Sequence, residues 1–152
     1  LLLARLRTDP KEYVRAAAVD ALGKRKTPGA AAALREALAV DSHRDEVRTA
    51  ALKALTALAK PGDAVTLAAV RPYVDYKWGK GGQHAVRQAA LEAVVALAPE
   101  APETMALLVA CCGDAYFRMR GWAVEHLRKR KADTPEVRGM AKAVPHLVAI
   151  VE

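Results

Sequence analysis

Apolar and polar positions alternate along the chain in a nine-residue motif that occurs four times. The motif begins at residues 14, 47, 86 and 119, where the chain reads VRAAAVDAL, VRTAALKAL, VRQAALEAV and MRGWAVEHL. The apolar residues stand at the first, fourth, fifth, eighth and ninth positions, which is the spacing of one stripe along an α-helix. Small side chains in the middle of the stripe let another helix approach closely. Each occurrence therefore predicts one amphipathic helix.

A second apolar segment follows each motif, and it opens at or near a proline. The four segments are PGAAAALREALAV, DAVTLAAVRPYV, PETMALLVACC and PEVRGMAKAVPHLVAIV. Proline is tolerated in the first turn of a helix, where its missing N–H has no partner to lose. We expect Gly23 and Gly62 to break the chain within the first two helix pairs, and Thr27, Asp63 and Thr134 to cap second helices.

The starts of the motif lie 33, 39 and 33 residues apart, which is typical of a stacked repeat array. We expect a single all-α domain over residues 1–152, an α-solenoid of about four antiparallel helix pairs. The expected repeats are 9–40, 41–74, 75–112 and 113–152, with residues 1–8 as the end of a preceding helix. Both ends are apolar, so we expect the chain to be an excerpt of a longer protein.

The motif resembles that of the HEAT repeat family, in particular the short bacterial HEAT-like repeats of the phycobilin-lyase type. The resemblance covers essentially the whole chain and implies a ladder of ion pairs between an Asp before the first helix and an Arg near its start. The matching pairs are Asp9 with Arg15, Asp41 with Arg48, and Asp114 with Arg120. The third repeat departs from this scheme, because Asp75 stands twelve residues before Arg87. We expect these arginines to be structural.

The net charge of +7 favours acidic partners or nucleic acid. Some of this charge follows the first helices, at the turns within the helix pairs. The expected basic edge consists of Lys24, Arg25, Lys26, Arg128, Lys129, Arg130 and Lys131. Cations are also favoured at a helix C-terminus by the helix dipole, so a capping role is the alternative.

Six of the seven aromatic residues fall at junctions between repeats, and we expect them to line the opposite edge. The longer third period places an insertion around YVDYKWGKGGQH, the most unusual stretch of the chain. Exposed rings make good contact anchors, whereas buried rings would hold adjacent helices together. The candidates for partner binding are Tyr76, Trp78, Lys80, Tyr116 and Phe117.

No motif in the chain encodes a recognisable reaction. The four histidines lack zinc-ligand spacing, Ser42 is the only serine, and Cys111 and Cys112 lie in an apolar segment. GKGG at residues 79–82 lacks the spacing of a phosphate-binding loop. We expect no catalytic residue, no metal, no cofactor and no membrane insertion. The two adjacent cysteines and the absence of a visible secretory signal lead us to expect a cytoplasmic location.

The leading hypothesis is a non-catalytic scaffold that binds a protein, a peptide or another domain of the same chain. One alternative is an accessory C-terminal helical domain of a zinc aminopeptidase of the aminopeptidase N type, whose repeat junctions are similar to RPYVDYKWGKGGQHAVRQAAL. The zinc-binding His-Glu-x-x-His motif is absent here, so any activity would lie in another part of such an enzyme. The other alternative is nucleic-acid binding through the basic edge.

Overall fold

The computed structural model describes residues 1–27, 29–58, 60–77 and 83–129. These residues form helices joined by turns and include no strand, so the predicted all-α, repeat-built fold is confirmed. The chain divides into two compact units, Leu1–Pro99 and Glu100–Glu152. The repeat boundaries and the single domain that we expected stay predictions.

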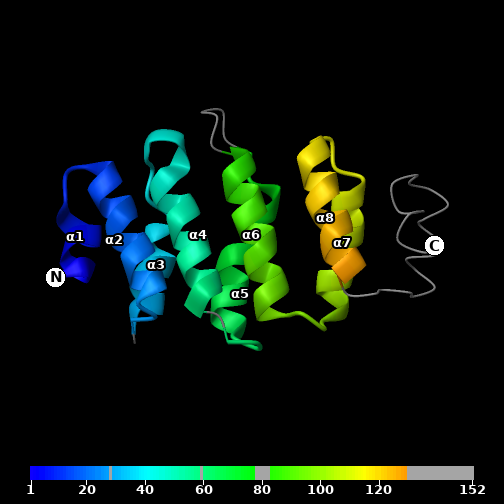
Figure 1. The fold of residues 1–152 in the computed structure, drawn as a ribbon, viewed down its shortest axis with the longest axis horizontal. Helices are drawn as coiled ribbons and strands as arrows, with labels where there is room; N and C mark the ends of the chain where they lie inside the picture. The colour runs from blue at the N-terminus through cyan, green and yellow to red at the C-terminus, as the bar shows by residue number, and fades with distance from the viewer. Residues whose placement is uncertain (28, 59, 78–82, 130–152) are drawn as a thin grey trace. The chain divides into compact units, whose positions relative to one another are not determined.

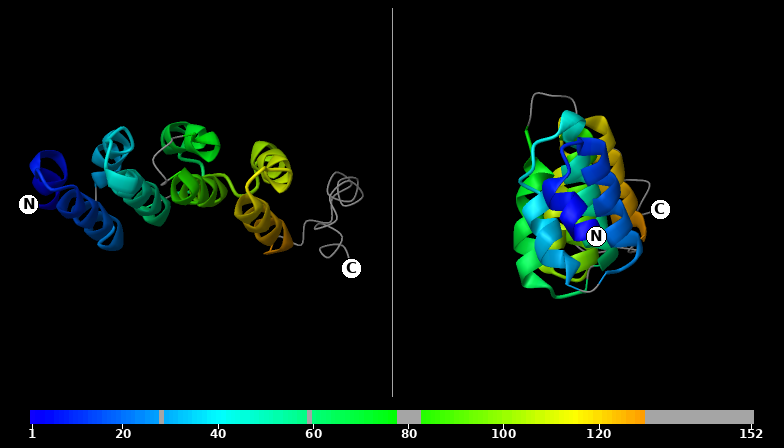
Figure 2. Two further views of the ribbon diagram at one scale, coloured as in Figure 1. Left: turned by 90° about the horizontal axis from the view of Figure 1, so that it is seen from above. Right: turned by 90° about the vertical axis from the view of Figure 1, so that its left-hand side faces the viewer.

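Unit 1, Leu1–Pro99, consists of two layers of helices (Figures 1 and 2). The first-helix layer contains α2 (Glu12–Lys24), α4 (Glu46–Leu58) and α6 (Gln83–Leu97), which run side by side. The second layer contains α1 (Leu2–Thr8), α3 (Ala30–Ala37) and α5 (Ala64–Val70). Two short 3-10 helices, η1 (His43–Asp45) and η2 (Arg71–Asp75), lie in the connections between repeats.

The core of unit 1 lies between these layers, but its pattern differs from the predicted stripe. In α4 the first, fifth, sixth and ninth motif positions are fully buried, namely Val47, Ala51, Leu52 and Leu55. The fourth position, predicted to be apolar and buried, is exposed at Ala17 in α2 and only half-buried in α4. The buried face turns away from this position because the large sixth residue packs into the unit. The alanine at the fourth position is left on the outer face in α2 and α4, whereas in α6 the prediction is confirmed, since Ala89 is 1% exposed.

We expected Gly23 to break the chain, but this residue lies buried inside α2. A Cβ atom at Gly23 would lie 2.7 Å from both Cα and Cβ of Ala54, so only glycine allows α2 to come this close to α4. The break predicted at Gly62 is confirmed, since its φ is +90°. The N–H of Gly62 donates to the carbonyl of Leu97 at 2.8 Å, which ties the turn after α4 to the end of α6.

The N-cap predicted at Asp63 is confirmed. Its carboxylate accepts hydrogen bonds from the backbone N–H of Thr66 at 3.0 Å and from the Thr66 hydroxyl at 2.7 Å. These two bonds hold the pKa of Asp63 below its ordinary value. The cap predicted at Thr27 is wrong, because the chain enters α3 through Gly29, whose φ of 72° makes the turn. Thr134 lies outside the described residues.

In unit 2, Glu100–Glu152, the structure describes two helices that pack on each other. Helix α7 (Pro102–Cys112) coincides with the predicted segment PETMALLVACC, and α8 (Phe117–Lys129) contains the fourth motif. Cys111 and Cys112 are buried at the end of α7, and burial raises the pKa of Cys112 to about 11. That thiol is therefore protonated at neutral pH. The second helix predicted after α8 lies outside the described residues.

Candidate functional site

The arginine at the second position of each motif donates a hydrogen bond to a main-chain carbonyl in the segment before its helix. In three repeats the donor is Nε and the acceptor belongs to a residue of, or next to, the preceding helix. The pairs are Arg15 with Leu6 at 3.0 Å, Arg48 with Leu38 at 2.7 Å and Arg87 with Val74 at 2.7 Å. In unit 2, Arg120 Nη1 donates to the carbonyl of Asp114 at 2.8 Å. The arginine thus provides a donor for a main-chain carbonyl that has no partner within its own helix, and its positive charge complements the dipole at the end of the preceding helix.

The carboxylates expected to pair with these arginines differ from repeat to repeat. Asp41 forms the predicted ion pair with Arg48, at 3.1 Å. The pair predicted between Asp9 and Arg15 does not form within the described residues, because Arg5, one helical turn before Asp9, reaches its carboxylate at 2.8 Å. The backbone N–H of Lys11 also donates to Asp9, and this bond, with Arg5, lowers the pKa of Asp9 against the opposing effect of burial.

In unit 2 the carboxylate of Asp114 accepts a hydrogen bond from the backbone N–H of Tyr116 at 2.8 Å. Arg120 reaches the main-chain carbonyls of Asp114 and Ala115, the second at 3.2 Å. The same aspartate thus fixes the turn that leads into α8. Its main-chain carbonyl oxygen accepts the hydrogen bond from Arg120.

Arg48 is the centre of a polar group that we call the junction cluster, which consists of the buried Arg48 and Asp45, the half-buried Tyr73 and Tyr76, and the exposed Asp41. Only 5% of Arg48 is exposed, and it pairs with Asp45 as well as Asp41. Its guanidinium lies 4.9 Å from the ring centroid of Tyr76 and 5.7 Å from that of Tyr73. The cluster therefore joins the start of α4 to the residues that follow α5.

The environment of the junction cluster keeps Arg48 positively charged and the hydroxyl of Tyr76 protonated. Burial disfavours the Arg48 cation, but the hydrogen bond with Asp41 and the neighbouring acidic groups outweigh it, so the pKa of Arg48 is raised. Burial and the carboxylate of Asp45 raise the pKa of Tyr76 to about 12, although Arg48 opposes this shift. Arg44 and Asp45 have φ values of 52° and 54°, a strained conformation for residues with a side chain.

Tyr76, one of the predicted partner contacts, is half-buried, and its hydroxyl lies within hydrogen-bond distance of both Arg48 and Asp45. Trp78 and Lys80 lie outside the described residues. Tyr116 is half-buried against Phe117, with ring centroids 5.4 Å apart. Phe117 is 62% exposed, which leaves its ring accessible on α8. The role of these residues in partner binding stays a prediction.

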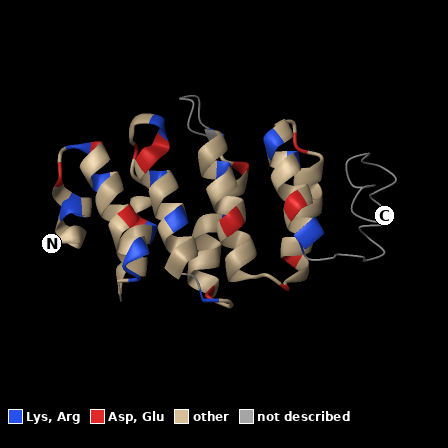
Figure 3. Ribbon diagram, in the orientation of Figure 1, with Lys and Arg blue, Asp and Glu red and all other residues tan. Residues whose placement is uncertain are grey.

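The expected basic edge is divided between the two units, and both parts include acidic neighbours (Figure 3). In unit 1, Lys24, Arg25 and Lys26 are exposed at the end of α2, and Lys24 pairs with Asp20 at 2.6 Å. In unit 2, Glu125 lies 4.0 Å from Arg128 and 3.6 Å from Lys129. Arg130 and Lys131 lie outside the described residues. The acidic partners reduce the charge that these stretches present to a polyanion.

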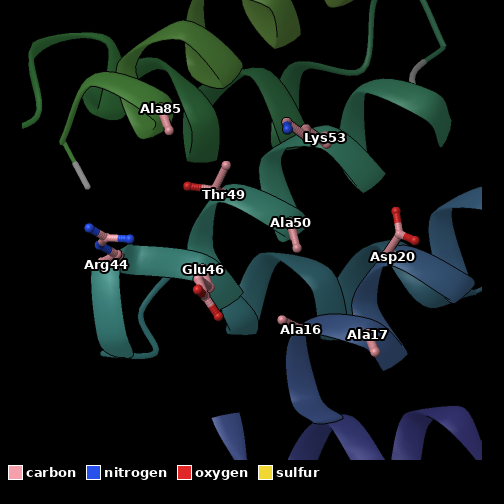
Figure 4. Close-up of a pocket in the computed structure, with 9 residues that line it drawn as sticks. All are labelled: Ala16, Ala17, Asp20, Arg44, Glu46, Thr49, Ala50, Lys53 and Ala85. Atoms are coloured by element: carbon pink, nitrogen blue, oxygen red, sulfur yellow. The ribbon is translucent and has the colours of Figure 1, made fainter. Parts of the chain in front are cut away.

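A groove of about 410 Å³ crosses the outer face of the first-helix layer in unit 1 (Figure 4). Side chains of α2, α4 and α6 line it, together with Arg44 of η1. Alanines make up much of the lining, and charged side chains and one threonine make up the rest. The lining residues are Ala16, Ala17, Asp20, Arg44, Glu46, Thr49, Ala50, Lys53 and Ala85.

The groove was not predicted from the sequence, because the alanines at the fourth motif position were expected to lie in the core. The available signal was the sixth position, where the larger residues Val19, Leu52 and Leu91 stand beside the small fourth residue. A helix buries its large apolar residues in preference to alanine. The sixth position therefore belongs to the core, and Ala17 and Ala50 to the surface.

Two polar groups at the groove lack a partner in the part of the chain that the structure describes. The Thr49 hydroxyl oxygen is buried and makes no hydrogen bond. Lys53 is exposed and makes no ion pair there. A buried hydroxyl without a partner is energetically unfavourable, so Thr49 carries a cost to stability, and its oxygen is closed to solvent and to a ligand in the groove.

The described residues include no group of three or more histidine, cysteine or acidic side chains that could hold a metal ion. In the same residues, no helix combines the length and the apolar character that crossing a membrane requires.

The model of the family described as HEAT repeats matches residues 1–78, just over half of the 152 residues. Comparison with curated proteins and with solved structures gives no significant match.

Proposed function

Because the chain belongs to the HEAT repeat family, whose repeats generally mediate protein interactions, we propose that it is a non-catalytic scaffold that binds a partner protein in the groove. Members of this family are typically not enzymes. The observation that carries the proposal is the open groove across α2, α4 and α6, with its alanine surface and charged sides.

The alanine surface supports protein binding for a geometric reason. Methyl groups let the backbone of a partner come close to the three helices, and the contact removes apolar area from water. Asp20, Glu46, Arg44 and Lys53 provide both signs of charge around this area. Charges of both signs favour a partner in one orientation over a uniformly charged polymer.

A photo-crosslinking residue in place of Ala50 tests the proposal, with Ala32 as the matched control. Ala50 lines the groove, whereas Ala32 is exposed on α3 in the second layer. In cells that make the protein, we expect the residue at position 50 to crosslink a defined partner that the residue at position 32 does not. Crosslinks to the same proteins from both positions, or none from position 50, would refute the groove as the binding surface.

The two alternatives lead to different results. An accessory aminopeptidase domain would belong to a longer protein that carries the His-Glu-x-x-His motif. A nucleic-acid-binding domain would bind DNA with a strong salt dependence, and reversing the charge of Lys129 would weaken that binding. We also propose a cytoplasmic location, which the content of two cysteines in 152 residues supports.

A further inference from the structure

Three charged residues occupy equivalent positions on the three helices that line the groove, and two of them, Asp20 and Lys53, lie in the groove itself. Asp20, Lys53 and Glu92 all occupy the seventh position of their motifs, one on each of α2, α4 and α6. Because these helices run side by side in register, the middle of α2 is acidic, that of α4 basic and that of α6 acidic (Figure 3). We call these three residues the charge row.

The charge row is available to a partner. Asp20 and Lys53 line the groove, and both are exposed. The ion pair of Asp20 with Lys24 leaves 54% of the Asp20 side chain exposed. Glu92 is half-buried and accepts a hydrogen bond from the amide of Gln88 at 3.0 Å, which leaves its negative charge uncompensated by that neighbour.

The spacing of the row indicates the secondary structure of the partner. Packed helices lie about 8–10 Å apart, so the three charges repeat at about that interval. A helix rises about 1.5 Å per residue, so side chains seven residues apart share one face and are separated by about 10.5 Å. In an extended chain, side chains about three residues apart span the same interval, but they point to opposite faces and could not all meet the row. The row therefore fits a helix better than a strand.

The groove surface favours the same choice. An extended peptide carries backbone N–H and C=O groups that need partners, and the alanine side chains of the groove offer none. A helix satisfies these groups internally, so only its side chains have to match the surface. The methyl groups of Ala17 and Ala50 would allow its close approach.

We propose that the groove and the adjoining surface of α6 receive an α-helix of a partner protein that presents a basic, an acidic and a basic side chain at seven-residue intervals, opposite Asp20, Lys53 and Glu92. This inference rests on the proposed function and names the kind of partner. The helix crosses α2, α4 and α6, and its central acidic residue pairs with Lys53.

Two synthetic helical peptides of identical composition test the proposal. One carries Lys, Glu and Lys at seven-residue intervals on an alanine face, and the other carries Glu, Lys and Glu there, with the exchanged residues on the far face. By fluorescence anisotropy, we expect the first peptide to bind on the order of tenfold more tightly, as three exposed ion pairs together would give. Added salt should reduce this difference.

A charge-reversed protein provides the second arm. The variant with Asp20→Lys, Lys53→Glu and Glu92→Lys should prefer the second peptide. Glu36→Lys on α3 is the matched control, because it changes the net charge equally on the other layer. This control should keep the preference of the unmodified protein. Circular dichroism would check that each variant is folded. If the triple variant does not fold, the comparison of the two peptides on the unmodified protein decides the matter.

The inference is overturned if the unmodified protein binds both peptides equally or binds neither. It is also overturned if a folded triple variant keeps the original preference. A partner crosslinked from position 50, together with failure of both peptides, would reject the helix and leave the scaffold standing. The absence of specific crosslinks from position 50 would instead reject the proposed function.

Discussion

The junction cluster and the groove share helix α4 but use their polar groups in opposite ways. Arg48 is buried and pairs with Asp41 and Asp45, whereas its neighbour Thr49 lines the groove with a hydroxyl that has no hydrogen-bond partner in the described residues. Successive residues on a helix point about 100° apart, so one turn of α4 serves both the stack and the outer face. The polar groups of the cluster are paired within the fold, whereas in the groove Lys53 makes no ion pair within the described residues.

In this chain, backbone strain and a shifted pKa do not by themselves mark a functional site. The positive φ values of Arg44 and Asp45 and the shifted pKa of Tyr76 are features that often mark active sites. Here Asp45 and Tyr76 belong to the junction cluster that connects one repeat to the next, and both are shielded from solvent at least in part. Arg44 is exposed and lines the groove, and it is the one residue of the described groove lining with a positive φ.

The largest expected effect comes from breaking the junction cluster with Arg48→Met. Removal of the guanidinium leaves Asp45, which is 2% exposed, as a buried charge without its main partner. We expect a loss of about 3–5 kcal/mol in the free energy of unfolding, measured by chemical denaturation. The reduced stability should be visible even though the substitution keeps most of the side-chain volume.

Arg15→Met is the matched control, since Arg15 occupies the same motif position in the preceding repeat. Its Nε donates to the carbonyl of Leu6, but Arg15 is only half-buried and has no ion pair within the described residues. We expect its removal to cost about 1 kcal/mol. Equal losses for the two variants would contradict the distinction between a buried cluster and a simple helix cap.

The second expected effect concerns the spacing of the helices that carry the groove. Gly23→Ala would place a methyl group 2.7 Å from Ala54, so α2 and α4 would have to move apart. We expect a loss of about 1–3 kcal/mol in the free energy of unfolding and weaker binding of the Lys-Glu-Lys peptide, because the charge row widens. Denaturation and fluorescence anisotropy on the same sample would measure both.

Gly121→Ala is the control for helix propensity. Gly121 lies within α8, and a Cβ atom there would meet no atom of the described residues within 4 Å. Alanine should therefore stabilise that helix by about 0.5–1 kcal/mol. If Gly23→Ala were also stabilising, the close approach of α2 and α4 would not be what requires glycine.

The sequence predicted the helices, their repetition and the cap at Asp63, because these depend on local spacing and on residues within one turn. It did not predict the close contact of Gly23 with Ala54 or the exchange of Arg15 for Arg5 as the partner of Asp9. Both depend on which neighbouring side chain comes nearer in space. The groove escaped prediction because the fourth motif position was expected in the core, although the larger residues at the sixth position indicate that Ala17 and Ala50 lie on the surface.

The smallest expected effect has the opposite sign and separates stability from binding. Thr49→Val replaces a buried hydroxyl that has no partner by a methyl group of similar shape. Because an unsatisfied buried polar group is unfavourable, we expect the free energy of unfolding to rise by about 0.5–1 kcal/mol, as measured by chemical denaturation. Because the Thr49 oxygen is closed to solvent, the same change should leave the affinity for the Lys-Glu-Lys peptide unchanged. A variant that lost stability would instead indicate that the hydroxyl is satisfied within the fold, and the groove would then resemble the junction cluster.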